Sequence, residues 1–212
     1  MVDLKELSEA IIDGEAAEAV ELTTSALEEG IAPSDILNNG LVAGMNVVGE
    51  YFKNNEFYVP EVLIAARAMQ KSMDILKPKL LEAGAEPKGV VAIGTVKGDL
   101  HDIGKNLVTM MLKGVGLEVY DVGVDVEPQA FIDKAEEVGA DIICMSALLT
   151  TTMPNIQATI DLLKEQGLRD KYIVMVGGAP VNQSFADQVG ADIYTADAAS
   201  CAEAAKAALL AK

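Results

Sequence analysis

The chain contains a single histidine, His101, which lies in the segment GDLHDIG at residues 98–104. A neutral imidazole is the commonest protein ligand of a transition metal, and a metal-bound imidazole usually donates its other ring N–H to a carboxylate. Asp99 and Asp102 are both close enough in sequence to be that carboxylate. The alternative is a turn histidine flanked by helix-capping acids, because one histidine without a nearby Cys or His cannot build a zinc site. The segment therefore poses the question of which metal needs only one protein ligand.

The composition narrows the classes of partner. The chain has 212 residues, 50% of them hydrophobic, and a formal net charge of −17. Its length and hydrophobic content predict a folded protein of one large or two small domains. The negative charge argues against nucleic acid or an anionic membrane as a partner, because both repel an acidic surface. No stretch has the length and apolar character of a membrane span, and the N-terminus does not resemble a secretion signal, so we expect a cytoplasmic protein.

The sulfur-containing residues indicate packing rather than metal binding. Cys144 and Cys201 are far apart in sequence, the first in an apolar run and the second in an alanine-rich segment. We interpret both as small buried hydrophobic side chains in a reducing compartment. The methionines fall at the spacing of helix core positions, as for Met45, Met69, Met73, Met110 and Met111.

Residues 1–85 have apolar side chains spaced by three and four, which predicts helix throughout. Four helical segments are separated by Gly, Pro and Asn residues near 13–14, 29–34 and 53–55, with a further break expected after Pro78. The segments are short enough, and their connections tight enough, for an antiparallel four-helix bundle. We expect this helical domain to end at residue 85, within a linker at 82–87.

From residue 88 the pattern changes to short Val- and Ile-rich runs that alternate with amphipathic helices. Strands are predicted at 89–95, 117–122, 141–146, 172–177 and 192–195, and helices near 103–115, 128–138, 153–166, 182–189 and 199–211. Five such βα units predict an α/β domain over 88–212 with a doubly wound parallel sheet, Rossmann-like and flavodoxin-like with strand order 2-1-3-4-5.

In that topology the crevice beyond the carboxyl ends of the first and third strands is where a ligand should bind. His101 follows the first strand, Ser146 and Thr150 follow the third, and Gly177-Gly178 follows the fourth. Taken singly, Ser146 is also interpretable as a capping hydroxyl, and the glycine pair as a turn. Together they predict a slot with an imidazole at its mouth. The loop lacks the glycine spacing of a dinucleotide fingerprint or a P-loop, which makes nucleotide binding the less favoured use of the fold.

The pattern Asp99-x-His101-x-x-Gly104, followed by Ser146-x-Leu148 and Gly177-Gly178, resembles the cobalamin-binding signature of corrinoid proteins. The segments 44–49 and 52–62 resemble the helical cap that precedes the binding domain in methyl-transferring members. The whole chain is thus similar to the corrinoid proteins of three-component methyltransferase systems, and to the cap and cobalamin-binding modules of cobalamin-dependent methionine synthase.

The resemblance implies an answer to the question of the lone histidine, since the corrin ring supplies four nitrogens to cobalt. His101 is then the lower axial cobalt ligand, Asp99 hydrogen-bonds its other ring nitrogen, and Ser146 hydrogen-bonds Asp99. Such a relay would raise the basicity of the imidazole while cobalt is methylated, and would accept a proton when the ligand is released.

The resemblance also implies roles for residues around the cofactor. Those expected at the corrin edge are Gly98, Leu100 and Asp102, with Gly104 and Leu148 completing the motifs. Those expected at the nucleotide tail are Thr150, Gly177 and Gly178, with Ala198 closing the pocket. Phe52 and Val59 of the cap would cover the methyl group and exclude solvent. The alternative for Phe52 and Val59 is ordinary core packing of the bundle.

The function implied is that of a methyl carrier. Cobalt(I) would accept a methyl group from a substrate activated by one methyltransferase, and a second methyltransferase would pass it from methylcobalamin to tetrahydrofolate or a thiol. A reductive activator protein is a further expected partner. Methylamines, quaternary amines, methanol and aryl methyl ethers remain possible donors.

Two other classes share parts of this pattern. Cobalamin-dependent sensors carry a DNA-binding domain before the cap, whereas here the bundle is expected to start at the N-terminus and the charge does not suit DNA. Binding subunits of adenosylcobalamin mutases share the histidine loop but lack the cap.

Overall fold

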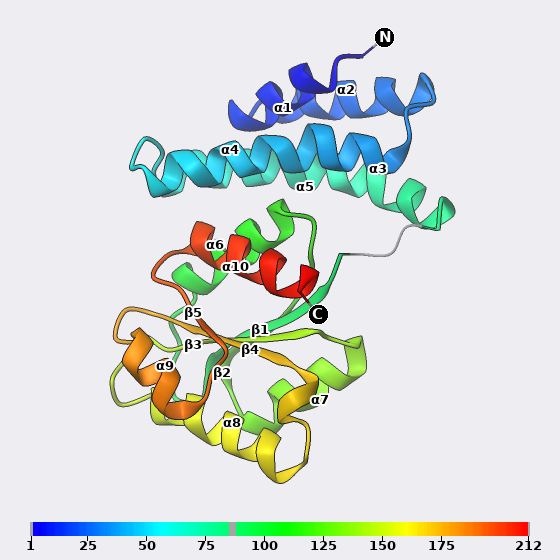
Figure 1. The fold of residues 1–212 in the computed structure, drawn as a ribbon. Coiled ribbons are helices and arrows are strands. Elements are labelled where there is room, and N and C mark those ends of the chain that lie inside the picture. The colour runs from blue at the N-terminus through cyan, green and yellow to red at the C-terminus, as the bar shows by residue number, and fades with distance from the viewer. Residues whose placement is uncertain (1, 85–87, 212) are drawn as a thin grey trace. The chain divides into compact units, whose positions relative to one another are not determined.

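A computed structural model describes residues 2–84 and 88–211 of the chain (Figure 1). A helical unit precedes the undescribed segment, and an α/β unit begins at Lys88. The two units are described separately below. Residues 85–87, where the sequence predicts the end of one domain and the linker to the next, lie outside the described residues.

The helical unit consists of four successive helical segments, as predicted. They are α1 (Leu4–Ile12), α2 (Ala16–Glu28), a continuous third segment of α3 (Pro33–Asp35), η1 (Ile36–Leu41) and α4 (Val42–Lys53), and α5 (Val59–Glu82). The segment η1 is a π-helix, in which the chain is wound more loosely than in the flanking turns. Helix α1 packs against α2, η1 and α4, and α5 packs against both α2 and α4.

Helical periodicity accounts for this packing. In α1 the buried residues Leu7, Ala10 and Ile11 recur at intervals of three and four, so they share one face. In α5 the same spacing continues over several turns, and its buried residues are Val62, Ala65, Ala68, Met69, Ser72, Leu76 and Leu80. The core of the unit is formed by these apolar stripes.

The expected break after Pro78 is wrong, because α5 continues to Glu82. A proline removes one backbone donor from a helix but does not prevent later residues from closing their own hydrogen bonds. The N–H of Ala83 donates to the carbonyl of Lys79 at 3.0 Å, and Leu80 is buried. Packing of the last turns therefore outweighs the local disadvantage of the proline.

The α/β unit contains a five-stranded parallel sheet in the order β2-β1-β3-β4-β5, which confirms the predicted flavodoxin-like topology. The strands are β1 (Val90–Val96), β2 (Glu118–Val126), β3 (Ile142–Ser146), β4 (Ile173–Gly177) and β5 (Ile193–Tyr194). The helices are α6 (Ile103–Gly114), α7 (Pro128–Val138), α8 (Pro154–Glu165), η2 (Arg169–Lys171), α9 (Gln183–Val189) and α10 (Ala198–Leu210).

Helices cover both faces of this sheet (Figure 1). On one face, α7, α8 and α9 enclose a core that includes Phe131, Ile156 and Val189, together with Ile143 and Val174 of the strands. Helices α6 and α10 lie over the other face. Because side chains alternate along a strand, the neighbours Ile142 and Cys144 point toward α6 and α10 instead. Loops that follow the carboxyl ends of the strands form the site.

Cys144 of β3 and Cys201 of α10 are both buried and unoxidised, in agreement with the packing interpretation. The sequence does not indicate that they lie near each other, yet the Cys201 thiol, together with burial, raises the pKa of Cys144. The pair joins the central strand to the C-terminal helix.

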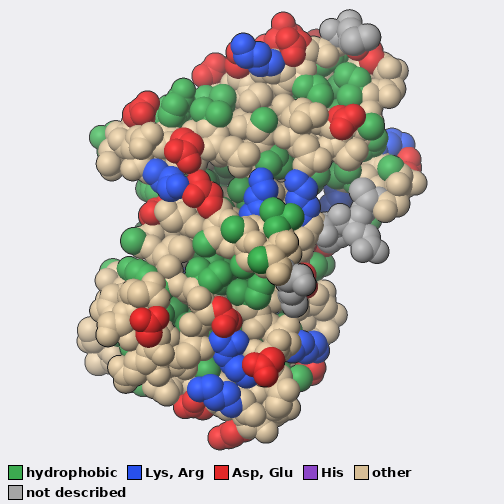
Figure 2. Space-filling model, viewed as in Figure 1, with side chains coloured by type: hydrophobic (Ala, Val, Ile, Leu, Met, Phe, Trp, Pro, Cys, Tyr) green, Lys and Arg blue, Asp and Glu red, His purple; other side chains and the backbone are tan. Residues whose placement is uncertain are grey.

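On the face shown in Figure 2, Lys and Arg side chains lie among Asp and Glu side chains. The α/β unit contains the ion pairs Lys134–Glu137 and Lys171–Glu136. Among the described residues, no helix combines the length and apolar character needed to cross a membrane.

Candidate cofactor-binding site

Three small residues stand side by side where the central strands end. Thr95 of β1 is in register with Ser146 of β3, which in turn is in register with Gly177 of β4. Because the strands are parallel, these residues and the loops that follow them share the carboxyl edge of the sheet. The loop after β1 carries Asp99 and His101, as the sequence analysis predicts.

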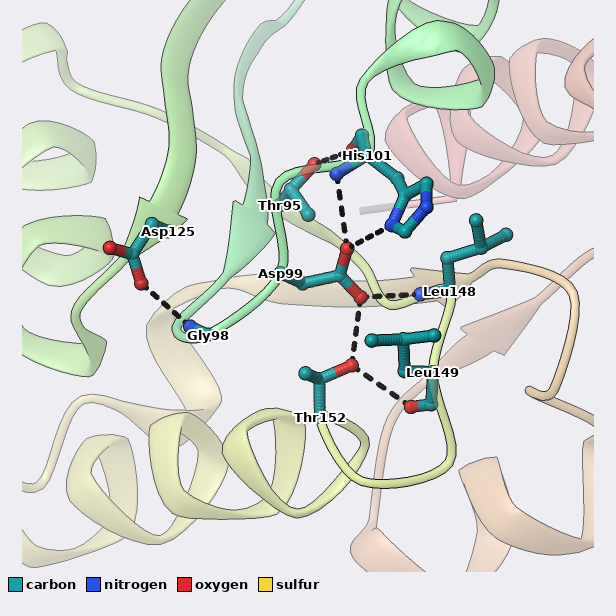
Figure 3. A network of polar contacts seen from close by, with 8 residues as sticks. All are labelled: Thr95, Gly98, Asp99, His101, Asp125, Leu148, Leu149 and Thr152. Atoms are coloured by element: carbon teal, nitrogen blue, oxygen red, sulfur yellow. Dashed lines mark hydrogen bonds and ion pairs between the residues drawn. The ribbon is translucent and has the colours of Figure 1, made fainter.

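Asp99 is the centre of a network of hydrogen bonds (Figure 3). Its side chain is fully buried. Oδ1 accepts the backbone N–H of His101 at 3.1 Å and lies 2.9 Å from Nδ1 of the His101 ring. Oδ2 accepts the backbone N–H of Leu148 at 2.7 Å and lies 2.7 Å from the hydroxyl of Thr152. Four donors therefore converge on one carboxylate.

These donors keep Asp99 ionised. Burial alone would raise the pKa of this carboxyl group, because it disfavours the charged form. The hydrogen bonds from Leu148, Thr152 and His101 outweigh that effect and hold the pKa of Asp99 well below its usual range. At neutral pH the side chain is an acceptor only.

The ionised state of Asp99 determines the tautomer of His101. Since Asp99 Oδ1 can only accept, the proton of a neutral imidazole is on Nδ1, which leaves the lone pair on Nε2. The ring nitrogen that does not face Asp99 points away from it (Figure 3). The side chain of His101 is 54% exposed, so Nε2 is open to a ligand from outside the protein.

The third member of this network is Thr152, whereas the sequence analysis assigns that place to Ser146. Among the described residues, Ser146 donates no hydrogen bond to Asp99, whose donors are those named above. The chain turns sharply after β3, and this turn places the buried Thr152 beneath the carboxylate. The hydroxyl of Thr152 also lies 2.9 Å from the carbonyl of Leu149, but the carboxylate is the stronger acceptor.

Exposed apolar side chains occur in both segments near the exposed imidazole, the loop after β1 and the turn after β3. Leu100 and Ile103, which flank His101 in sequence, are 72% and 78% exposed. Leu148 and Leu149 of the turn after β3 are also exposed and lie beside the network in Figure 3. Sequence reasoning names Leu100 and Leu148 but misses Ile103 and Leu149. An apolar surface around one polar ligand is typical of a site for a large, mostly apolar molecule.

Two glycines near the site differ in whether the protein's own structure requires a glycine at that position. Gly178 has φ +119°, and a Cβ added to it would lie 1.9 Å from the carbonyl oxygen of Ala147, so no other residue fits. A Cβ on Gly104, at the start of α6, would meet nothing within 4 Å. Neither crowding nor backbone conformation within the protein requires a glycine there. A flat ligand that approaches the start of α6 would require one.

The other predicted binding residues are found around the same edge or on the helical unit. Gly98 and Asp102 belong to the loop after β1, Thr150 is exposed in the turn after β3, and Ala198 is the buried first residue of α10. Phe52 of α4 is half-buried and Val59, the first residue of α5, is 37% exposed. These two are thus less buried than core residues such as Val48 and Val62, although their predicted role at the cofactor stays a prediction.

The donor set fits a metal that brings most of its ligands with it. Among residues 2–84 and 88–211, no group of three or more His, Cys, Asp or Glu side chains could hold a bare metal ion. What the site offers is one neutral nitrogen with a fixed tautomer, an apolar rim, and open space at Gly104. This combination suits a planar metal complex bound from one side.

Two family comparisons cover most of the chain. Residues 89–208 and residues 3–77 each match a family described as a B12 binding domain. A dimethylamine corrinoid protein of Methanosarcina acetivorans is 44% identical over 211 residues, covering 99% of this chain and 97% of that protein. A trimethylamine corrinoid protein of the same organism is also 44% identical and covers 95% of this chain and 94% of its own length.

Solved structures give the same result. A cobalamin-binding protein from Desulfitobacterium hafniense superposes with a TM-score of 0.82 at 32% identity, covering 98% of both chains. The methanol:cobalamin methyltransferase complex MtaBC from Methanosarcina barkeri contains a chain that superposes with a TM-score of 0.86 at 32% identity. The match covers 97% of this chain and 79% of that one.

Proposed function

The chain belongs to the corrinoid proteins with B12 binding domains, and we propose that it carries a methyl group on a cobalamin whose cobalt is bound by His101. The observation that carries this proposal is the open Nε2 of the exposed His101. Oδ1 of the ionised Asp99 lies 2.9 Å from Nδ1 and keeps the ring proton there, so the lone pair of the neutral ring is on Nε2. When bound, the corrinoid supplies a cobalt centre that accepts a methyl group and gives it up again.

The residues around the cobalt have separable tasks in this proposal. Nε2 of His101 binds the metal, and Asp99 holds the proton of the same ring on Nδ1, which increases the electron density that Nε2 donates. Thr152 and the N–H of Leu148 hold Asp99 in place from the other side. The network thus acts on the metal only through one imidazole.

The apolar rim binds the ring of the cofactor and excludes water. Leu100, Ile103, Leu148 and Leu149 present their side chains to solvent, and covering them would release the water that hydrates them. Gly104 leaves room for the edge of a flat molecule. The sheet edge at Ser146 and Gly177 is the proposed place of the nucleotide tail, because both residues are small and half-buried at the end of their strands.

The methyl donor we propose is a methylamine. The support is that relatives named for dimethylamine and trimethylamine are 44% identical to this chain over nearly its whole length. A substrate-specific methyltransferase would load the cofactor. A second methyltransferase would pass the methyl group to tetrahydrofolate or a thiol, and a reductive activator would restore the cofactor after oxidation. Phe52 and Val59 are proposed to shield the methyl group between these encounters.

The single histidine allows a direct test of cobalt ligation. Protein labelled with 15N only in histidine is loaded with cobalamin, reduced to the cobalt(II) form, and compared with unlabelled protein by electron paramagnetic resonance. A nitrogen ligand splits the cobalt lines, so we expect the 14N triplets to become 15N doublets on labelling. His101→Ala should lose the splitting from the protein. Splitting that does not change with the label would contradict ligation by His101.

The donor class is tested separately. The loaded protein is reduced to the cobalt(I) form and mixed with a dimethylamine, trimethylamine or methanol methyltransferase together with the donor of that enzyme, and methylation of the bound cobalamin is followed by its absorption spectrum. We expect methylation with a methylamine and its cognate methyltransferase, and none with methanol. Methylation from methanol with a methanol-specific methyltransferase, but not from any methylamine, would refute this donor class while leaving cobalt ligation intact.

A further inference from the structure

The carboxyl end of β2 departs from regular pairing at the place where it passes the histidine loop. Between Ile93 and Gly94 of β1, β2 advances by two residues, from Asp121 to Gly123, and it gains another residue before Val126. Such bulges bend a strand and re-aim its side chains. The irregular part of β2 therefore has a defined shape that a straight edge strand would not have.

Asp125, within this bulged part, has φ +53°. Of the described residues other than glycine, only Asn55 and Asp125 have positive φ. The left-handed conformation is unfavourable for an ordinary L-residue and least unfavourable for Asn and Asp. A residue held in this way needs compensating contacts.

The compensating contacts of Asp125 go to the residues just before His101. Asp125 Oδ1 accepts the backbone N–H of Gly98 at 2.6 Å, and the backbone N–H of Asp125 donates to the carbonyl of Asp99 at 2.9 Å. Figure 3 shows the first of these bonds on the side of the loop opposite Thr152. Gly98 itself has φ +77°, so the segment it begins has a conformation that needs to be held.

The same strand also holds the residues just after His101. Asp121 forms an ion pair with the buried Lys105 in the first turn of α6. The other oxygen of Asp121 accepts the N–H of Gly123 at 2.9 Å, within the bulge. The bulged end of β2 thus contacts the chain on both sides of His101, at Gly98 and Asp99 before it and at Lys105 after it.

We propose that Asp125 is a positioning residue for His101, because it fixes the Gly98–Asp99 backbone from which the Asp99 carboxylate reaches Nδ1. Residues 99–102 have no helix or strand of their own, so hydrogen bonds hold them to the sheet, among them one from the Thr95 hydroxyl to the carbonyl of His101 at 2.8 Å. Asp125 provides two of those around Asp99. Without these two bonds the Asp99 carboxylate would move more, and its hydrogen bonds would form a smaller part of the time. The orientation of the imidazole would then become less well defined. This proposal rests on the proposed ligation of cobalt by His101.

Three substitutions at Asp125 separate its contributions. Asp125→Asn keeps an acceptor oxygen and a residue that tolerates positive φ. Asp125→Gly keeps the conformation but removes the acceptor, and Asp125→Ala removes both. The matched control is Asp141→Gly. Asp141 makes a comparable pair of bonds at the opposite end of β1, both of them to Val90 and without a positive φ. Its Oδ2 accepts the N–H of Val90 at 3.1 Å, and its backbone N–H donates to the carbonyl of Val90 at 2.8 Å.

The readouts are the histidine nitrogen splitting of the cobalt(II) form, retention of cobalamin, and the thermal unfolding midpoint of the apoprotein. We expect Asp125→Asn to keep the splitting. Asp125→Gly is expected to reduce the splitting and to weaken cobalamin retention by roughly tenfold, as is typical for residues that orient a metal ligand. Asp141→Gly should lower the midpoint without changing the splitting.

Two outcomes would overturn the proposal. One is equal splitting in all folded Asp125 variants. The other is loss of splitting that parallels loss of thermal stability across the Asp125 and Asp141 variants alike, since this indicates only a role in folding. Failure of cobalt ligation by His101 is a different result, because in that case the splitting in the wild-type protein does not change on 15N labelling of histidine.

Discussion

The loop after β1 and the turn after β4 lie at the same edge of one sheet, but they are held by different forces. The loop is held by hydrogen bonds, with four donors on Asp99 and two further bonds from Asp125. The turn also has backbone hydrogen bonds, since the carbonyls of Gly177 and Gly178 accept the N–H groups of Ala147 and Val181 at 3.1 Å and 3.0 Å. What distinguishes it is close contact, because Gly178 packs directly on the backbone of Ala147. Steric contact allows no alternative residue, whereas a set of hydrogen bonds can be weakened one at a time. The loop is therefore the part whose chemistry can be adjusted by substitution.

The largest effect is expected at the turn. In Gly178→Ala the new Cβ would lie 1.9 Å from the Ala147 carbonyl oxygen, at a backbone φ of +119°. Strain and overpacking together should lower the free energy of unfolding by roughly 3 kcal/mol or more, measured by urea denaturation of the apoprotein. The matched control is Gly177→Ala, where the nearest atom to the new Cβ is 3.8 Å away. It should change stability by less than about 1 kcal/mol. Equal effects at both positions would contradict the steric account.

The next largest effect is expected for Asp99→Asn. The Asn side chain has only one acceptor oxygen. Its NH2 group would face N–H and O–H donors that now donate to the second carboxylate oxygen, which should lower the free energy of unfolding by about 2–3 kcal/mol. The folded pKa of Asp99 is lowered, so its contribution to stability is present above the unfolded pKa and is lost as pH falls toward the folded one. The wild type should therefore lose stability more steeply than the variant between about pH 5 and pH 2. Parallel pH profiles in acid urea titrations would be the contrary result.

A smaller effect separates Thr152 from Ser146. Thr152→Val removes one donor from Asp99 with little change in shape and should cost about 1–2 kcal/mol. It should also reduce the Nδ1-protonated form of His101, which is visible in the 15N spectrum of the histidine-labelled apoprotein. Thr152→Ser retains the hydroxyl and is the rescue control, and Ser146→Ala should leave the ring spectrum unchanged. A ring spectrum altered by Ser146→Ala and not by Thr152→Val would restore Ser146 as the third member.

The smallest effect on folding is expected for Gly104→Ala. The new methyl group meets no atom within 4 Å, so the stability of the apoprotein should stay the same or rise by up to about 1 kcal/mol. Cobalamin affinity should nevertheless fall about tenfold, because the methyl group would occupy space needed by the flat ring. Titration with cobalamin, followed by absorbance, gives the dissociation constant. Unchanged affinity would show that Gly104 is not at the cofactor.

The sequence is a good guide to the fold because the periodicity of apolar residues is continuous within each element. It also places Asp99 and His101 together, since they are two residues apart in one loop. It cannot distinguish Thr150, Thr151 and Thr152 from one another, nor from Ser146, because the choice depends on how the chain turns after β3. The sequence also does not predict the hydrogen bond between Asp125 and Gly98, because bulges in β2 bring together residues that are 27 positions apart.

The four donors around Asp99 also determine where a proton can be stored. With its oxygens already engaged and its pKa held low, this carboxylate is a poor place for another proton. Because the ring proton lies on Nδ1, where Asp99 accepts it, the lone pair of Nε2 is the position of this pair that is left for a metal. The buried carboxylate is thus a fixed counter-charge behind an exposed ring.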